Sequence, residues 1–207
     1  LTTHNATVNS YNEQRMNELK GARYAFDATV TGTFPETSYP AEKTLELKKG
    51  RQVMFLKNDS QGTRYYNGKL GIITSIDDEH IRVRGLDDDI EVEVQPDVWT
   101  NARYVIDKKT KEIREEIEGE FRQYPLRLAW AITVHKSQGS EYRAVILSAW
   151  NGSPYLLSRS VLYTAITRAR ELLIIVGRQE TVAAMTGNAK RGRRYTGLKL
   201  RLQGKSE

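Results

Sequence analysis

Short apolar runs separated by polar turns fill the middle of the chain and predict strands there. Residues 52–56, 71–76, 80–83 and 90–94 each place apolar side chains over a length typical of strands. The dipeptide Asn67-Gly68 between the first two runs is a turn signal. Strands that recur at intervals of about ten residues favour a small antiparallel barrel.

Two longer extended segments follow the predicted barrel. Residues 102–106 and 112–121 are expected to pair as a hairpin over a turn at residues 108–111. Ile113 and Ile117 would then share one face at strand period, although their spacing of four positions also fits a helix. We favour the strand interpretation.

Both ends of the chain have the pattern of an α/β domain. Residues 5–19 space apolar side chains at helical intervals. From residue 125 onward, a buried segment and a polar loop precede a strand at 144–147, a helix at 156–170 and a strand at 172–176. This order is typical of a parallel sheet with crossover helices.

The fold class expected from these patterns is α/β with an inserted antiparallel barrel. Residues 1–21 and 125–185 would form the α/β domain, and residues 22–45 would be a linker. Residues 46–124 would form the barrel with its hairpin, and residues 186–207 a basic C-terminal tail.

Composition limits the function classes. The 207 residues contain no cysteine and only three scattered histidines, which excludes disulfides and argues against a metal site. No apolar stretch reaches the roughly 20 residues of a membrane span. We therefore expect a cytoplasmic protein. The net charge of +6 favours a polyanionic partner.

Two polar segments carry the candidate chemistry. Residues 133–141 read TVHKSQGSE and residues 163–170 read YTAITRAR, and each lies between apolar runs. Polar loops at the ends of buried elements line the ligand crevices of open α/β sheets. The hydrogen-bond donors of the first loop suit phosphate oxygens, and Gly139 lets the backbone approach a ligand closely. Alternatively, this loop is an ordinary connection in which Ser140 caps a helix.

These two segments resemble motifs V and VI of superfamily 1 helicases, in the branch that contains RecD and the Pif-type enzymes. The Pif-type motif sequence is close to the segment LRLAWAITVHKSQG of this chain. The RecD sequences are nearer to the segments GSEYRAVILS and RRYTGLKLRL. LTTHNATVNSYNEQRM resembles the region around motif IV, and GRQVMFLKNDSQGTRYYNGKLGIITSI resembles the SH3-like barrel that both groups insert. The resemblance implies a RecA-like domain of the P-loop NTPase type. It also implies the C-terminal half of an ATP-dependent DNA helicase that travels 5′ to 3′.

In that family ATP lies between two RecA-like domains, and the second domain supplies a cation across the cleft. By its place in the motif, Arg168 would be this catalytic arginine finger, and Gly139 and Glu141 would approach the nucleotide. A guanidinium suits the role because it is always charged and presents a planar set of donors. In the alternative, Arg168 pairs with Glu171 or caps its helix, and Glu141 is an acid in the first turn of a helix.

The resemblance also implies contacts to the DNA backbone from Thr133, His135 and Lys136. A hydroxyl, an imidazole and an ammonium group can each bind a phosphate. A core histidine is the alternative for His135. Tyr65 and Tyr66 could stack on bases, although tyrosines of small barrels more often pack in the core or at its rim.

The sequence has neither a GxxxxGK[ST] loop nor an acidic Walker B strand. ATP and Mg²⁺ are the expected cofactors, with the Mg²⁺ ligands in an N-terminal RecA-like domain of the same protein. This chain alone is therefore predicted not to hydrolyse ATP. Single-stranded DNA and that N-terminal domain are the expected partners. A non-catalytic nucleic-acid-binding module and a RecD-type subunit of a recombination nuclease complex remain alternatives.

Overall fold

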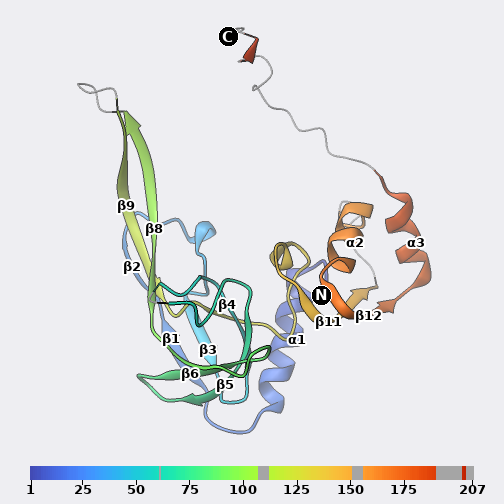
Figure 1. Cartoon of the computed structure of the whole chain (residues 1–207), viewed down its shortest axis with the longest axis horizontal. Coiled ribbons are helices and arrows are strands. Elements are labelled where there is room, and N and C mark those ends of the chain that lie inside the picture. Colours follow the sequence, from blue (N-terminus) through green and yellow to red (C-terminus); the bar gives the residue numbers. More distant parts are fainter. Residues whose placement is uncertain (61, 107–111, 151–155, 190–201, 204–207) are drawn as a thin grey trace.

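The computed structural model describes residues 1–60, 62–106, 112–150, 156–189 and 202–203. The chain contains a five-stranded sheet. Figure 1 shows a long hairpin that extends away from this sheet and an α/β group on the other side. Helix α1 lies between the sheet and the α/β group. The observed class is therefore mixed α/β, as the sequence predicts.

The central sheet is antiparallel, with strand order β10-β4-β5-β6-β7. Among the described residues no strand pairing closes it, so the predicted closed barrel is not confirmed. The strands are short because turn residues interrupt the apolar runs. Their bounds are Gln52–Phe55 for β4, Leu70–Ile76 for β5, Ile81–Gly85 for β6, Glu91–Val94 for β7 and Leu126–Leu128 for β10.

Residues 22–45, expected as a linker, contain secondary structure. Strand β1 (Tyr24–Asp27) pairs antiparallel with β3 (Thr44–Leu47), and a 3-10 helix, η1, spans Glu36–Ser38. Leu45 and Leu47 are fully buried and belong to the same apolar core as the central sheet. This segment therefore helps to build that core, whereas the domain limits remain a prediction.

The predicted hairpin is confirmed, and it is longer than expected. Strands β8 (Asp97–Ile106) and β9 (Ile113–Gln123) pair antiparallel, and β2 (Thr29–Gly32) pairs with the base of β9. The strand interpretation of residues 113–121 is therefore correct. The predicted turn at residues 108–111 lies outside the described residues.

The α/β group contains a parallel strand pair, as predicted. Strand β11 (Tyr142–Ala149) pairs with β12 (Ala169–Gly177), and helices α2 and α3 pack on one another beside them. Helix α1 covers Asn5–Glu18, α2 covers Arg159–Ile166 and α3 covers Gln179–Gly187.

Helix α2 is shorter at both ends than the predicted helix at residues 156–170. The hydroxyl of Ser158 accepts a hydrogen bond from the backbone N–H of Val161 and so fixes the start of the helix. Thr167 ends it, and the chain is already extended at Ala169. Arg168 therefore lies in the junction between helix and strand.

Candidate nucleotide and DNA site

The two motif-bearing segments meet at the amino ends of the parallel strands. The backbone N–H of Tyr142, at the start of β11, donates to the carbonyl of Arg168, just before β12, at 2.8 Å. The 3-10 helix η2 (His135–Ser137) forms the preceding part of the motif V loop. The sequence therefore identifies two loops that the fold does bring together.

Arg168 is half-buried and uses all three of its guanidinium nitrogens on uncharged oxygens. Nη1 donates to the carbonyl of Ser140 at 2.7 Å, and Nε donates to the carbonyl of Thr164 at 3.0 Å. Nη2 donates to the hydroxyl of Thr167 at 3.1 Å. No carboxylate of the described residues pairs with Arg168, so its charge is not neutralised by a neighbour within that part of the chain.

Of the two alternative roles of Arg168, the structure rejects the ion pair and supports the helix cap. Glu171 pairs with Arg143, with nitrogen–oxygen distances of 3.1 and 3.2 Å, so the alternative in which Arg168 pairs with Glu171 is wrong. The bond from Arg168 to the carbonyl of Thr164 does cap the last turn of α2. Two donors of Arg168 are thus used at the end of α2, on Thr164 and Thr167, and only Nη1 reaches the motif V loop, at Ser140.

Gly139 and Glu141 lie next to this junction. Gly139 has φ of +84° and open space around its α-carbon, so another atom can approach the backbone there. Glu141 is exposed, and its Oε2 lies 3.7 Å from Nε of Arg170. Because β11 begins at Tyr142, neither Ser140 nor Glu141 is in a helix, and both helix-based alternatives are wrong.

A polar cavity of about 250 Å³ joins the motif V loop to the central sheet. Four charged side chains line it, and three of them, Asp87, Arg143 and Arg170, are not among the site residues that the sequence predicts. Arg143 pairs with Glu171 at 3.1 Å and Arg170 pairs with Glu141 at 3.7 Å, so each arginine of the cavity already has a carboxylate partner. The lining residues are Tyr66, Gly68, Asp87, Gly139, Ser140, Glu141, Arg143 and Arg170.

The expected DNA-binding residues lie at the other end of the loop. Thr133 is buried, and its hydroxyl accepts a hydrogen bond from the backbone N–H of Lys136 at 3.4 Å. His135 and Lys136 are exposed on η2. Partial burial and the nearby charge of Arg127 lower the pKa of Lys136. The exposed pair can reach a phosphate directly, whereas the hydroxyl of Thr133 keeps its donor proton but is buried within the loop.

The two tyrosines considered for base stacking differ. Tyr65 is buried and stacks on Phe55, with ring centroids 4.3 Å apart, so it is a core residue. Tyr66 is 53% exposed and lines the polar cavity. Only Tyr66 has a ring face available to a ligand.

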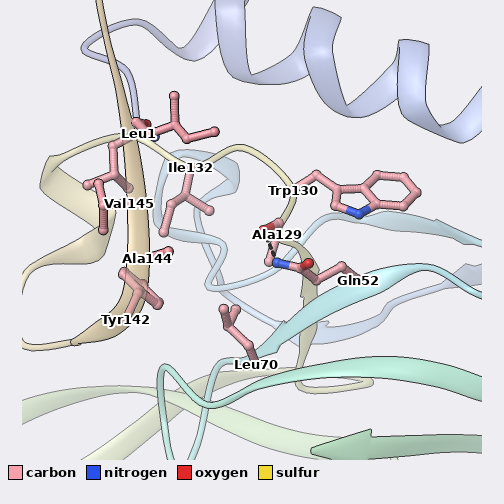
Figure 2. Close-up of a pocket in the computed structure, with 10 residues that line it drawn as sticks. Leu1, Gln52, Leu70, Ala129, Trp130, Ile132, Tyr142, Ala144 and Val145 are labelled. Carbon is pink, nitrogen blue, oxygen red and sulfur yellow. Dashed lines mark hydrogen bonds between the residues drawn. The ribbon is translucent and has the colours of Figure 1, made fainter. Parts of the chain in front are cut away.

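A second cavity, of about 210 Å³, lies between the central sheet and the α/β group. Figure 2 shows Gln52, Leu70, Trp130, Ile132 and Tyr142 around it. The side-chain amide of Gln52 donates to the carbonyl of Ala129 at 2.9 Å. No charged side chain lines this cavity, so it is a junction between two parts of the fold and not a site for phosphates.

No group of three or more metal-ligating side chains occurs among the described residues. None of the helices in the described part of the chain is both long and apolar enough to span a membrane.

Comparison with known proteins agrees with this geometry. The family model of the UvrD-like helicase C-terminal domain matches residues 128–176, which include both motif-bearing segments. The rat ATP-dependent DNA helicase PIF1 is 32% identical over 184 residues, covering 83% of this chain and 26% of that protein. The Pif1 of Bdellovibrio bacteriovorus is 32% identical over 166 residues, covering 77% of this chain and 34% of that protein.

Solved structures extend the match to nearly the whole chain. Bacteroides Pif1 in complex with ADP-AlF₃ and single-stranded DNA is 33% identical with a TM-score of 0.69, covering 99% of this chain and 44% of that one. Over most of its length the chain is therefore similar to a part of Pif1 helicases. The predicted relationship to the RecD and Pif-type branch is thereby confirmed.

The match to RecD covers a shorter part of the chain than the match to Pif1. The RecD subunit of Mycobacterium tuberculosis is 42% identical over 73 residues, which is 35% of this chain and 12% of that protein. The chain spans only about a quarter to a third of the curated Pif1 helicases described above. The activity of the whole protein is therefore a matter for proposal.

Proposed function

We propose that this chain is the C-terminal half of the motor of an ATP-dependent DNA helicase and supplies an arginine finger, Arg168, to a nucleotide bound against a second RecA-like domain. One observation carries this proposal: Arg168 has no carboxylate partner among the described residues and lies beside the Gly139–Glu141 loop.

Each of the candidate site residues would have its own role in ATP hydrolysis. The guanidinium of Arg168 would stabilise negative charge that develops on the transferred phosphoryl group. Gly139 would let the backbone approach the nucleotide, and Glu141 would accept a hydrogen bond from its ribose or a nearby water. Arg170, 3.7 Å from Glu141, would hold that carboxylate in place beside the phosphates. Bound ATP with Mg²⁺ would supply the phosphoryl group, with the Mg²⁺ ligands on the N-terminal domain.

The DNA contacts would come from His135 and Lys136, with Thr133 joining them if the loop opens. Single-stranded DNA is the substrate that the bound Pif1 structures support. Cycles of cleft closure and opening would move the domain along the strand, and 5′ to 3′ travel follows from the family resemblance. Such a substrate would place a bacterial-type protein in the cytoplasm at the nucleoid.

The direct test is the ATPase activity of the full-length protein, titrated with single-stranded, double-stranded and forked DNA. We expect single-stranded DNA to raise the rate, because the motor couples hydrolysis to movement on one strand. A rate that no DNA changes would contradict the motor function. Absence of ATPase activity would favour a non-catalytic nucleic-acid-binding module instead.

A RecD-type subunit of a recombination nuclease complex is the second candidate. The 73-residue match to RecD favours it, because that match has the higher identity. This function requires stable partners that a Pif-type enzyme does not. Purification of the full-length protein without overexpressed partners should then recover larger nuclease subunits, whereas a monomeric helicase would favour the Pif-type function.

A further inference from the structure

Ser140 connects the proposed catalytic arginine to the central sheet. Its carbonyl accepts the 2.7 Å hydrogen bond from Nη1 of Arg168, and its N–H donates to the carbonyl of Ser137 at 3.1 Å. The backbone of Ser140 therefore fixes one of the three bonds that orient the guanidinium. A shift of this residue would move an acceptor of Arg168.

The side chain of Ser140 packs against a turn of the central sheet. Gly68 lies in the predicted Asn67-Gly68 turn between β4 and β5, with φ of +95°. A β-carbon at Gly68 would collide with the hydroxyl oxygen of Ser140 and lie 3.3 Å from its β-carbon. The turn itself is held to the sheet, because the N–H of Gly68 donates to the carbonyl of Phe55 at 2.9 Å. The position of the turn therefore limits the position of Ser140.

Tyr142 provides a second connection between the same parts. Its backbone N–H binds the carbonyl of Arg168, and its hydroxyl lies 3.8 Å from the sulfur of Met54 on β4. Its ring packs with a small apolar cluster centred on Met54, Ala129 and Ile132. Figure 2 shows Tyr142 on the α/β side, facing Leu70 of the sheet. The sheet and the arginine junction are thus in contact at two points.

We propose that Ser140 is a positioning residue for Arg168, and that the turn at Gly68 sets its place, so that the central sheet controls the alignment of the arginine finger. This inference rests on the proposed function, because it gives Arg168 a catalytic role. A sheet displaced by a ligand or by DNA would move Ser140, and with it an acceptor of the guanidinium. Nucleotide affinity would change less than turnover, because the phosphate-binding loop and the Mg²⁺ ligands are expected on the N-terminal domain, while this loop contributes only Gly139 and Glu141.

The test is Gly68→Ala in the full-length protein, with Gly50→Ala as the matched control. Both glycines have positive φ, so alanine strains the backbone at either position. A β-carbon at Gly50 would meet only a methyl carbon of Leu19, at 3.7 Å, whereas at Gly68 it would force the hydroxyl of Ser140 to move and would press on its β-carbon at 3.3 Å. We expect Gly68→Ala to lower the kcat of DNA-stimulated ATP hydrolysis about tenfold or more, with KM for ATP changed by less than about threefold. Gly50→Ala should keep kcat close to the wild-type value.

A second substitution distinguishes a misplaced Arg168 from a general loss of folding. Ser140→Gly removes the side chain that collides with the β-carbon introduced by Gly68→Ala, but it keeps the carbonyl that accepts from Arg168. We expect the double variant Gly68→Ala, Ser140→Gly to recover most of the lost kcat, although it carries more backbone freedom than the single variant. Thermal unfolding of every variant would show whether the folded state is intact.

Three results would overturn the inference: an unchanged kcat in Gly68→Ala, an equal loss in Gly50→Ala, or no recovery in the double variant. The proposed function is tested separately by Arg168→Ala. If Arg168→Ala is inactive while Gly68→Ala has normal turnover, only the coupling through Ser140 is wrong. If Arg168→Ala has normal turnover, the catalytic role itself is wrong.

Discussion

At the scale of single residues, Arg51 carries a large electrostatic cost. Its side chain is fully buried, and its Nη1 donates to the carbonyl of Asn12 at 3.1 Å. The guanidinium carbon lies 4.7 Å from the centroid of the Trp130 ring, within range of a cation–π interaction. Within the described residues, Nε and Nη2 have no hydrogen-bond partner. Burial accordingly lowers the pKa of Arg51 to about 10.

The loss of stability on replacing Arg51 should therefore depend more on the volume of the new side chain than on its charge. Arg51→Ala should lower the free energy of unfolding by about 2–5 kcal/mol, because it leaves a cavity under Trp130. Arg51→Met should cost much less, since it fills the space and removes a poorly solvated charge. Urea denaturation of both variants gives the comparison. Equal losses would show that the charge, and not the packing, stabilises this junction.

At the scale of elements, two turns of the central sheet are predicted to make its stability depend on pH. Asp77 accepts backbone hydrogen bonds from Glu79 and His80 at 2.9 and 2.8 Å, which lower the pKa of its carboxyl. Asp88 accepts from Nζ of Lys69 at 2.7 Å, and this bond lowers the pKa of Asp88. Each carboxylate is thus stabilised in the folded state.

The sign of the effect follows from these lowered pKa values. Their contribution to stability is complete above the unfolded pKa, near 3.9, and is lost as pH falls through the lower folded values. We expect the free energy of unfolding to fall below about pH 4, and Asp77→Asn and Asp88→Asn each to reduce that fall. Urea denaturation at neutral pH and near pH 3 measures it.

Asp78→Asn is the control for this prediction. It removes a neighbouring charge but neither of the two backbone hydrogen bonds that Asp77 accepts. If Asp78→Asn reduced the acid sensitivity as much as Asp77→Asn, general charge repulsion would be the cause.

The elements also show how far local sequence patterns are informative. Alternation correctly predicts strands at residues 113–121, and Ile113 and Ile117 do lie at strand period. Both remain more than 60% exposed, because the hairpin extends away from the sheet and nothing in the described residues covers its outer part. A pattern of apolar residues predicts the strand but not what will cover it.

At the scale of the whole molecule, the α/β pattern and the meeting of the two motif-bearing loops could be predicted from the sequence. Whether the central sheet closes into a barrel could not be predicted, because closure depends on strand pairs between distant segments. The local pattern places Leu45 in a linker, because the strand that contains it is only four residues long. The burial of Leu45 depends on strands far along the chain. The pair between Arg143 and Glu171 likewise spans 28 residues. No local pattern indicates such a contact.

The central claim is that Arg168 acts on a nucleotide bound by a neighbouring domain. The most direct measurement is the single-turnover rate of DNA-stimulated ATP hydrolysis by full-length Arg168→Ala. Arg159→Ala is the matched control, because Arg159 lies at the opposite end of α2 and donates to the carbonyl of Thr186. We predict a fall of about 10³-fold or more for Arg168→Ala, with nucleotide affinity changed only a few-fold, and a normal rate for the control. A near-normal rate in Arg168→Ala would contradict the account.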